Sequence, residues 1–152
     1  MAERSVTHTT FTLERTYDAP PAKVFKAFAD PAIKRRWFVE GEGWEVDEFV
    51  SDFKIGGVER SRFRFKGGEP IRNDTSYHDI VPNERIIFAY TMTIGEKRIS
   101  ASLATCEFKP SGAGTQFVFT EQGAFLDGLD RAGPREGGWK QLLDALGRAL
   151  KS

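Results

Sequence analysis

Residues 117–150 read FVFTEQGAFLDGLDRAGPREGGWKQLLDALGRAL, and this stretch decides the fold. It opens on an alternating segment that is typical of a strand, continues through a segment rich in glycine, and enters a helix at Pro134. The helix repeats apolar residues at the i, i+3, i+4, i+7 and i+11 spacing of one stripe, namely Trp139, Leu142, Leu143, Leu146 and Leu150. A lone helix with so apolar a face needs a large partner surface, so we expect a sheet that wraps around it.

The segment upstream of this stretch supplies the sheet. From Trp44 onward the chain alternates, and turn residues such as Gly56-Gly57 and Pro82-Asn83 interrupt it. The expected strands span 44–50, 58–66, 75–81, 85–94, 97–109 and 114–122. Because turns this short join antiparallel neighbours, whereas a parallel pair needs a crossover of about a dozen residues, we predict an antiparallel sheet.

One strand and two short helices are expected before this sheet. Phe11–Tyr17 alternates and predicts the first strand, and Pro21 and Pro31 each suit the first turn of a short helix. Residues 1–9 are polar, and we expect them to form a frayed arm. The order β-α-α-β6-α predicts one α+β domain over residues 1–152, with about seven strands around a long C-terminal helix.

Composition narrows the class of protein. With 22 basic and 22 acidic residues the chain has no net charge, which disfavours a nucleic-acid partner because phosphate binding requires a basic excess. The single cysteine, Cys106, excludes an internal disulfide framework and fits a reducing cytoplasm. A run of about 18 apolar residues and a leader segment are both lacking, so we expect neither a membrane span nor a signal peptide.

Motifs for cofactor or metal chemistry are missing from the sequence. It contains no Gly-x-Ser-x-Gly elbow, no phosphate loop and no dinucleotide fingerprint. Its only histidines are His8 and His78, which give little support to a metal cluster or a Cys-His nucleophilic pair. We therefore expect no cofactor and no metal.

The strand faces predict an apolar pocket with a few polar groups. Glu59 shares a strand face with Phe63, while the opposite face is basic and suits solvent, and Glu121 ends a similar apolar row. A buried Glu59 could act as a general acid or base, or it could pair with an arginine. We expect the ligand to be bound by Trp37, Glu59, Phe63, Tyr77, Phe88, Tyr90, Phe117, Phe119, Glu121, Phe125, Trp139 and Leu143.

The glycines between Gln122 and Trp139 allow two interpretations. They permit tight turns and close backbone approach, so residues 122–138 could form a rigid, well-fitted loop. Alternatively the glycines let the loop move as a lid, with Phe125, Leu126 and Leu129 covering the mouth of the pocket.

Four segments, in this order along the chain, resemble one known family. They are TYDAPPAKVFKAFADPAIKRRWF (16–38), DFKIGGVERSRF (52–63), YHDIVPNERIIFAYTM (77–92) and TEQGAFLDGLDRAGPREGGWKQLLDALGRAL (120–150). The sequence is similar to the START and birch-pollen-allergen superfamily (SRPBCC), and within it to the family named after the activator of the heat-shock-protein-90 ATPase. The resemblance implies a helix-grip fold, in which an antiparallel sheet curls around the C-terminal helix and leaves a deep apolar cavity between them.

The resemblance implies several functions rather than one. Members of the superfamily bind lipids, sterols, hormones or polyketides, and some act as cyclases or aromatases. The eukaryotic activators carry an additional domain that this sequence lacks, so direct stimulation of the chaperone is not expected.

Three functional hypotheses follow. The first is a cytoplasmic protein that binds a small hydrophobic or aromatic molecule in its cavity without a cofactor. The second is a cyclase/aromatase- or hydrolase-type enzyme acting on a polyketide-like or ester substrate, with Glu59, Glu121 or Tyr77 as proton-transfer groups. The third is a chaperone cofactor or stress-related interaction protein that works through its surface. An edge strand could also pair two copies into a homodimer, although nothing in the sequence requires it.

Overall fold

The computed structural model describes residues 4–151, which form seven strands and three helices. In chain order these are β1 (Val6–Tyr17), α1 (Pro21–Ala29), α2 (Pro31–Phe38), β2 (Trp44–Ser51), β3 (Val58–Phe65), β4 (Ile71–Val81), β5 (Arg85–Ile94), β6 (Lys97–Ser111), β7 (Gly114–Leu126) and α3 (Ala132–Ala149).

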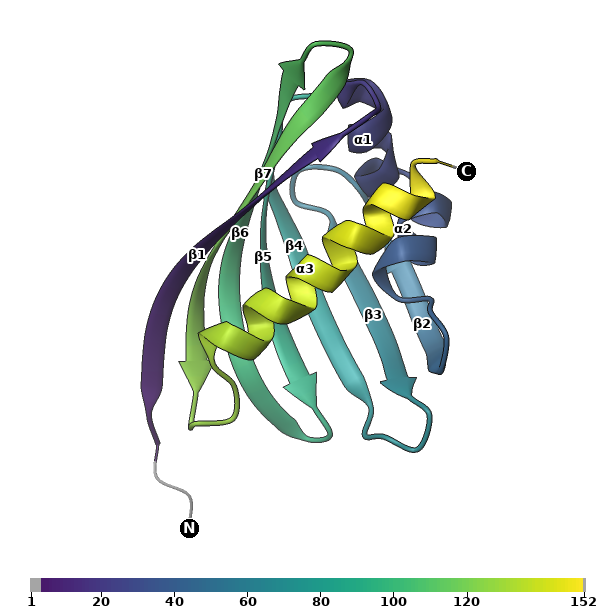
Figure 1. The fold of residues 1–152 in the computed structure, drawn as a ribbon. Coiled ribbons are helices and arrows are strands. Elements are labelled where there is room, and N and C mark those ends of the chain that lie inside the picture. Colours follow the sequence, from purple (N-terminus) through teal and green to yellow (C-terminus); the bar gives the residue numbers. More distant parts are fainter. Residues whose placement is uncertain (1–3, 152) are drawn as a thin grey trace.

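The strands form one antiparallel sheet in the order β1-β7-β6-β5-β4-β3-β2. Strands β2 to β7 pair with their neighbours in sequence, whereas β1 joins the sheet beside β7. Figure 1 shows the sheet curving around α3, which crosses its concave face, with α1 and α2 beside one end. The predicted α+β helix-grip fold is confirmed.

Local sequence explains how the helices begin and end. A proline occupies the first turn of both α1 and α2, where its missing N–H would have no intrahelical partner. Asp30 caps α2, because its carboxylate accepts a hydrogen bond from the Ala32 amide at 2.9 Å. At the C-terminal end of α3, the Lys23 ammonium of α1 donates to the Leu150 carbonyl at 2.8 Å, where a cation is favourable.

The apolar stripe of α3 lies on the concave face, as the helical spacing predicted. Trp139, Leu143 and Leu146 are all buried. The Tyr17 hydroxyl of β1 donates to the Leu143 carbonyl at 2.7 Å, and the Trp139 ring lies 4.1 Å from the Phe119 ring between centroids. The helix is therefore held by both packing and a buried hydrogen bond.

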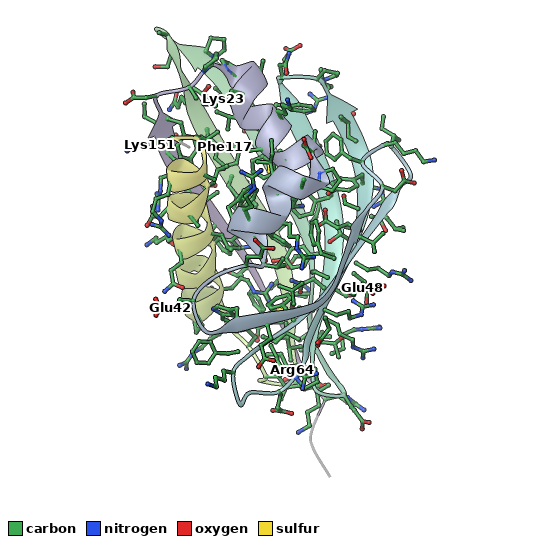
Figure 2. The ribbon with its side chains drawn as sticks, turned by 90° about the vertical axis from the view of Figure 1, so that its right-hand side faces the viewer. Lys23, Glu42, Glu48, Arg64, Phe117 and Lys151 are labelled. Atoms are coloured by element: carbon green, nitrogen blue, oxygen red, sulfur yellow. The ribbon has the colours of Figure 1, made fainter. Side chains whose placement is uncertain are left out.

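An aromatic cluster forms the core between α1 and the β6–β7 part of the sheet. Phe117 stacks on Phe28 at 5.5 Å between ring centroids, and the Phe108 ring contacts Phe117 edge-on at 5.3 Å. Phe25 contacts Phe108 at 5.5 Å. Phe117 is completely buried and lies in the interior between α1 and α3 (Figure 2).

The frayed arm predicted for residues 1–9 is corrected by the structure over part of its length. Residues 6–9 form the start of β1 and pair with residues 123–126 of β7. The Asp127 carboxylate then accepts hydrogen bonds from the Ser5 amide at 3.0 Å and from Arg4 at 2.8 Å. This polar segment is ordered because β7 is longer than predicted and offers it a backbone partner; residues 1–3 lie outside the described part of the chain.

The loop predicted over residues 122–138 is also corrected. Strand β7 continues to Leu126 and α3 begins at Ala132, so only residues 127–131 connect them. Phe125 is 1% exposed on β7 and is not part of this connection, and Gly138 lies inside α3. Leu129 does lie in the connection and lines the cavity, so a lid of residues 127–131 stays a prediction. The glycines suggested a long loop, but they lie within α3 because burial of the apolar stripe stabilises the helix by more than the low helix propensity of glycine destabilises it.

The aromatic core provides a direct test of the fold. Phe117→Ala should lower the free energy of unfolding by about 3–5 kcal/mol, because it leaves a cavity among three rings. The same substitution at the half-exposed Phe65 of β3 should cost less than about 1 kcal/mol. Urea unfolding of both variants checks this, and equal costs would contradict the assignment of Phe117 to the core.

Candidate ligand-binding cavity

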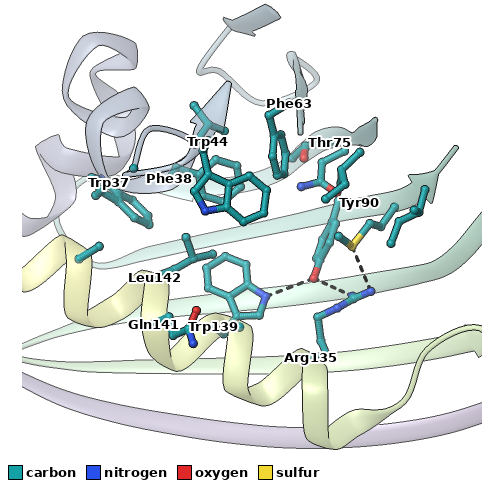
Figure 3. Close-up of a pocket in the computed structure, with 18 of the residues that line it drawn as sticks. Trp37, Phe38, Trp44, Phe63, Thr75, Tyr90, Arg135, Trp139, Gln141 and Leu142 are labelled. Carbon is teal, nitrogen blue, oxygen red and sulfur yellow. Dashed lines mark hydrogen bonds between the residues drawn. The ribbon is translucent and has the colours of Figure 1, made fainter. Parts of the chain in front are cut away.

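A cavity of about 510 Å³ lies between the concave face of the sheet and the N-terminal half of α3. Its walls come from β3, β4 and β5, from α2 with the segment that follows it, and from α3 (Figure 3). This volume falls within the usual range of small-molecule sites. All three tryptophans of the chain line it, namely Trp37, Trp44 and Trp139.

The walls are largely aromatic. Trp44 and Phe63 lie 5.6 Å apart between ring centroids on one side of the cavity. Phe38 of α2 contacts Trp139 of α3 at 6.1 Å, so these two rings join the helices across the cavity. Figure 3 shows the labelled tryptophans, Phe38 and Phe63 facing a shared space beside α3, which is the cavity.

The residues predicted to bind the ligand fall into two groups. Half of them line the cavity, namely Trp37, Glu59, Phe63, Phe88, Tyr90 and Trp139. The others are buried and do not line it, namely Tyr77, Phe117, Phe119, Glu121, Phe125 and Leu143. Several of these support the wall from behind, as Phe119 does beneath Trp139. The part that any of them plays in binding stays a prediction.

Glu59 belongs to a buried cluster at the inner wall of the cavity. The Lys34 ammonium of α2 donates to both Glu59 oxygens, at 2.9 and 2.8 Å, and the Tyr77 hydroxyl donates to Oε1 at 2.7 Å. Lys34 is 3% exposed and Glu59 is 1% exposed. Sequence reasoning allowed an arginine partner for Glu59, but the structure supplies a lysine. The arginines of β3 instead form ion pairs on the opposite face, as Arg64 does with Asp47 at 3.1 Å.

The Lys34–Glu59–Tyr77 cluster favours a fixed protonation state. Burial alone would lower the pKa of Lys34, but the Glu59 carboxylate and Tyr77 outweigh it, so the net pKa lies above its ordinary value. Burial raises the pKa of Tyr77 to about 12, with Lys34 opposing and Glu59 adding to the rise. Lys34 therefore stays charged and Tyr77 stays neutral at physiological pH.

Glu121 lies at the centre of a second buried cluster. Its carboxylate accepts hydrogen bonds from the Tyr90 hydroxyl at 2.7 Å, from Ser102 at 2.9 Å and from Arg135 of α3 at 3.0 Å. The Tyr90 hydroxyl also accepts from Arg135 at 3.0 Å and from the Trp139 indole at 3.2 Å (Figure 3). Tyr90 thus links the cavity wall to a carboxylate that the cavity does not reach.

The electrostatics of this second cluster resemble those of the first. Burial raises the pKa of Tyr90, Glu121 raises it further, and Arg135 opposes the change. Burial alone would lower the pKa of Arg135, but Tyr90, Glu121 and Asp130 raise it above its ordinary value. Asp130 also binds Arg135 directly, at 2.8 Å.

Sequence reasoning missed the two buried cations, Lys34 and Arg135. Arg135 lies four residues before Trp139 and so extends the apolar stripe of α3 by one turn. Lys34 lies three residues before Trp37 on α2 and shares its face. A cation on the buried face of an amphipathic helix was the available signal, since such a group requires a buried anion.

The described residues give little support to a cysteine nucleophile or a metal site, or to a membrane-spanning helix. Burial raises the pKa of the Cys106 thiol to about 12, so this cysteine stays protonated and is a poor nucleophile. Residues 4–151 contain no group of three or more histidine, cysteine, aspartate and glutamate side chains placed to hold a metal ion. Among the described helices, none has the length and apolar character needed to cross a membrane.

Comparisons with known proteins agree on the fold and the family. Residues 18–151 match the family model described as "Activator of Hsp90 ATPase homolog 1-like protein". The solved structure of the Mll3558 protein from Rhizobium loti is 53% identical, with a TM-score of 0.89 over 95% of this chain and 99% of that one. A putative uncharacterized protein from Rhizobium leguminosarum is 44% identical, with a TM-score of 0.94 over 98% of each chain. Protein CV1439 from Chromobacterium violaceum is 25% identical, with a TM-score of 0.78 over 94% of this chain and 97% of that one. No curated protein matches this chain significantly.

The Lys34–Glu59 pair can be tested by removing one charge and then both. Lys34→Met should lower the free energy of unfolding by about 3–5 kcal/mol, because Glu59 is left as an unpaired buried charge. Lys34→Met/Glu59→Leu should recover most of that loss, since it buries no charge. As a control, Arg64→Met breaks the exposed pair with Asp47 and should cost less than about 1 kcal/mol. Urea unfolding measures all three; a double variant as unstable as the single one would contradict this account.

The buried tyrosines predict a late alkaline titration. The only tyrosines, Tyr17, Tyr77 and Tyr90, all have a raised pKa in the folded protein, chiefly through burial. Folding therefore favours the neutral phenols, and their contribution to stability is complete below about pH 10 and is lost as pH rises towards the folded pKa values. Phenolate absorbance at about 295 nm should thus appear near pH 12 or with unfolding. A midpoint near pH 10 with native circular dichroism would show that a tyrosine is exposed.

Proposed function

Because this chain belongs to the Activator of Hsp90 ATPase homolog 1-like family, within the START and birch-pollen-allergen superfamily, we propose that it binds a small aromatic or hydrophobic molecule in the cavity beneath α3. The cavity itself carries the proposal. Its volume of about 510 Å³ and its wall of tryptophan and phenylalanine rings suit an aromatic molecule better than an elongated polar one. Binding is driven by removing apolar surface of both ligand and wall from water.

The entrance lies where exposed residues join the lining. Gly138 and Gln141 of α3 are exposed and lie along one side, and Trp44 is 40% exposed on the other. Leu129, in the connection between β7 and α3, is also 40% exposed and lines the cavity. A ligand therefore enters between the N-terminal half of α3 and the start of β2.

The cavity supports a binding function better than proton transfer at Glu59. Both oxygens of Glu59 are engaged by Lys34 and Tyr77, and its carboxylate is held in an ion pair. Glu121 and Tyr77, the other candidate acid-base groups, lie behind the lining. A general base must reach the proton that it removes, and these groups are occupied by their partners within the protein.

The proposal is tested by closing the cavity without disturbing the core. Gly138 lies in α3 at the entrance, and a Cβ added there meets nothing within 4 Å. Gly138→Leu should weaken binding of the uncharged fluorophore N-phenyl-1-naphthylamine by roughly tenfold or more, because leucine covers the entrance. Energy transfer from the three cavity tryptophans to the bound fluorophore measures the affinity.

Gly137→Leu is the matched control, since Gly137 has the same free space in the same helix but does not line the cavity. Both variants should raise helix stability by about 0.5–1 kcal/mol, because leucine has a higher helix propensity than glycine. Only Gly138→Leu should lose binding. Equal affinities in both variants, or no binding of the fluorophore by the wild-type protein, would contradict the proposed function.

A further inference from the structure

One row of side chains on the concave face makes hydrogen bonds at one end and lacks hydrogen-bond partners at the other. Ser61, Asn73, Met92 and Ser100 are successive partners across β3, β4, β5 and β6. At the β6 end, Arg135 donates to Ser100 Oγ at 2.6 Å and to Met92 Sδ at 3.4 Å. At the β3 end, Ser61 Oγ and Asn73 Oδ1 are buried and have no hydrogen-bond partner among the described residues.

Asn73 lines the cavity, and its side-chain amide makes no hydrogen bond to the described residues. Its side chain is 8% exposed, and it lines the cavity from β4 between Ile71 and Thr75. Leaving a buried amide oxygen without a donor is unfavourable, so native structures almost always supply a partner. Oδ1 has almost no accessible surface in this orientation of the amide, so a ligand in the cavity meets the amide nitrogen, or meets Oδ1 once the amide has turned over.

Two other polar groups of the wall, Glu59 and the Tyr90 hydroxyl, are already occupied. Glu59 accepts from Lys34 and Tyr77. The Tyr90 hydroxyl donates once and accepts twice, which is its full capacity. Asn73, in contrast, is a buried wall residue whose side chain makes no hydrogen bond within the described part of the chain.

The charges around the cavity disfavour an anionic ligand. The lining cations, Lys34 and Arg135, are both paired with buried carboxylates. The exposed rim carries Glu42 and Glu40, the latter paired with Arg35 at 2.7 Å. A ligand carboxylate would meet acidic side chains at the rim and would have to break an existing ion pair to gain a partner inside.

We propose that the cavity takes an uncharged aromatic molecule bearing a hydroxyl group, and that this hydroxyl binds the Asn73 side chain. The inference rests on the proposed function and identifies the chemistry of its ligand. A hydroxyl both donates and accepts, so it pairs with the Asn73 amide in either orientation of that amide. The aromatic wall contacts the remainder of the molecule.

The test compares two probes of similar shape, 2-naphthol and 2-methylnaphthalene, which differ by hydroxyl and methyl. Their Kd values are measured by displacement of N-phenyl-1-naphthylamine from the wild-type protein and from Asn73→Leu. The ratio of the Kd of 2-methylnaphthalene to that of 2-naphthol should fall by roughly tenfold in Asn73→Leu, because the hydroxyl loses its partner. Comparing the two ratios cancels the difference in hydration between the probes.

Met92→Leu is the matched control for this measurement. Met92 lies opposite Asn73 in the register and also lines the cavity, and leucine conserves its volume. The ratio in Met92→Leu should stay within about twofold of the wild-type value. An unchanged ratio in Asn73→Leu, while both naphthalenes still bind, would overturn the role of Asn73 and leave the proposed function intact. Failure of every probe to bind the wild-type protein would overturn both.

The charge of the ligand is tested with 2-naphthoate. It should bind the wild-type protein at least about tenfold more weakly than 2-naphthol at neutral pH, because its carboxylate finds no free cation among the lining residues that the structure describes. Equal or tighter binding of the anion would overturn the inference that the ligand is uncharged.

Discussion

The buried carboxylate of Glu121 is the point on which the position of α3 depends. It lies on β7 and accepts hydrogen bonds from Tyr90 on β5, Ser102 on β6 and Arg135 on α3, so one group joins three strands to the helix. The N-terminal end of α3 is rich in glycine and has little apolar surface to bury. Arg135 therefore holds this end of the helix against the sheet. Moving the helix away would separate a buried charge from its partner, which costs more than the loss of an ordinary apolar contact.

The cavity persists because its walls are anchored on both sides and because two small polar residues lie in the middle of its sheet wall. Lys34 fixes α2 to β3 through Glu59, as Arg135 fixes α3 to β7. Between these anchors, β4 presents Asn73 and Thr75 where larger apolar side chains would fill the space. Towards its C-terminal end, α3 packs on the aromatic core instead. One helix thus serves as a core element along one half and as the roof of a cavity along the other.

Sequence reasoning predicted the elements well because their signals are periodic and local. The stripe from Trp139 to Leu150, the alternation within the strands and the prolines at the helix starts all act over a few residues. The buried ion pairs join residues far apart in sequence, and which strand residues meet depends on register, which local patterns do not reveal. For the same reason the sequence could not separate wall residues such as Phe63 from the layer behind them, to which Phe119 belongs. That the Asn73 side chain lacks a hydrogen-bond partner also depends on how β3 and β4 pair, so it could be recognised only from the structure.

The place of β1 in the sheet has a consequence for how the chain acquires its structure. Val6–Tyr17 pairs only with β7, whose paired residues lie 98 to 120 positions later in the chain. On a ribosome, which releases earlier residues first, this strand waits without a backbone partner until β7 has been synthesised. The aromatic core faces the same delay, because Phe117 and α3 are also made late. Closing this loop has an entropic cost before any contact compensates it, so the complete sheet is expected to form slowly and only after β7 has been synthesised.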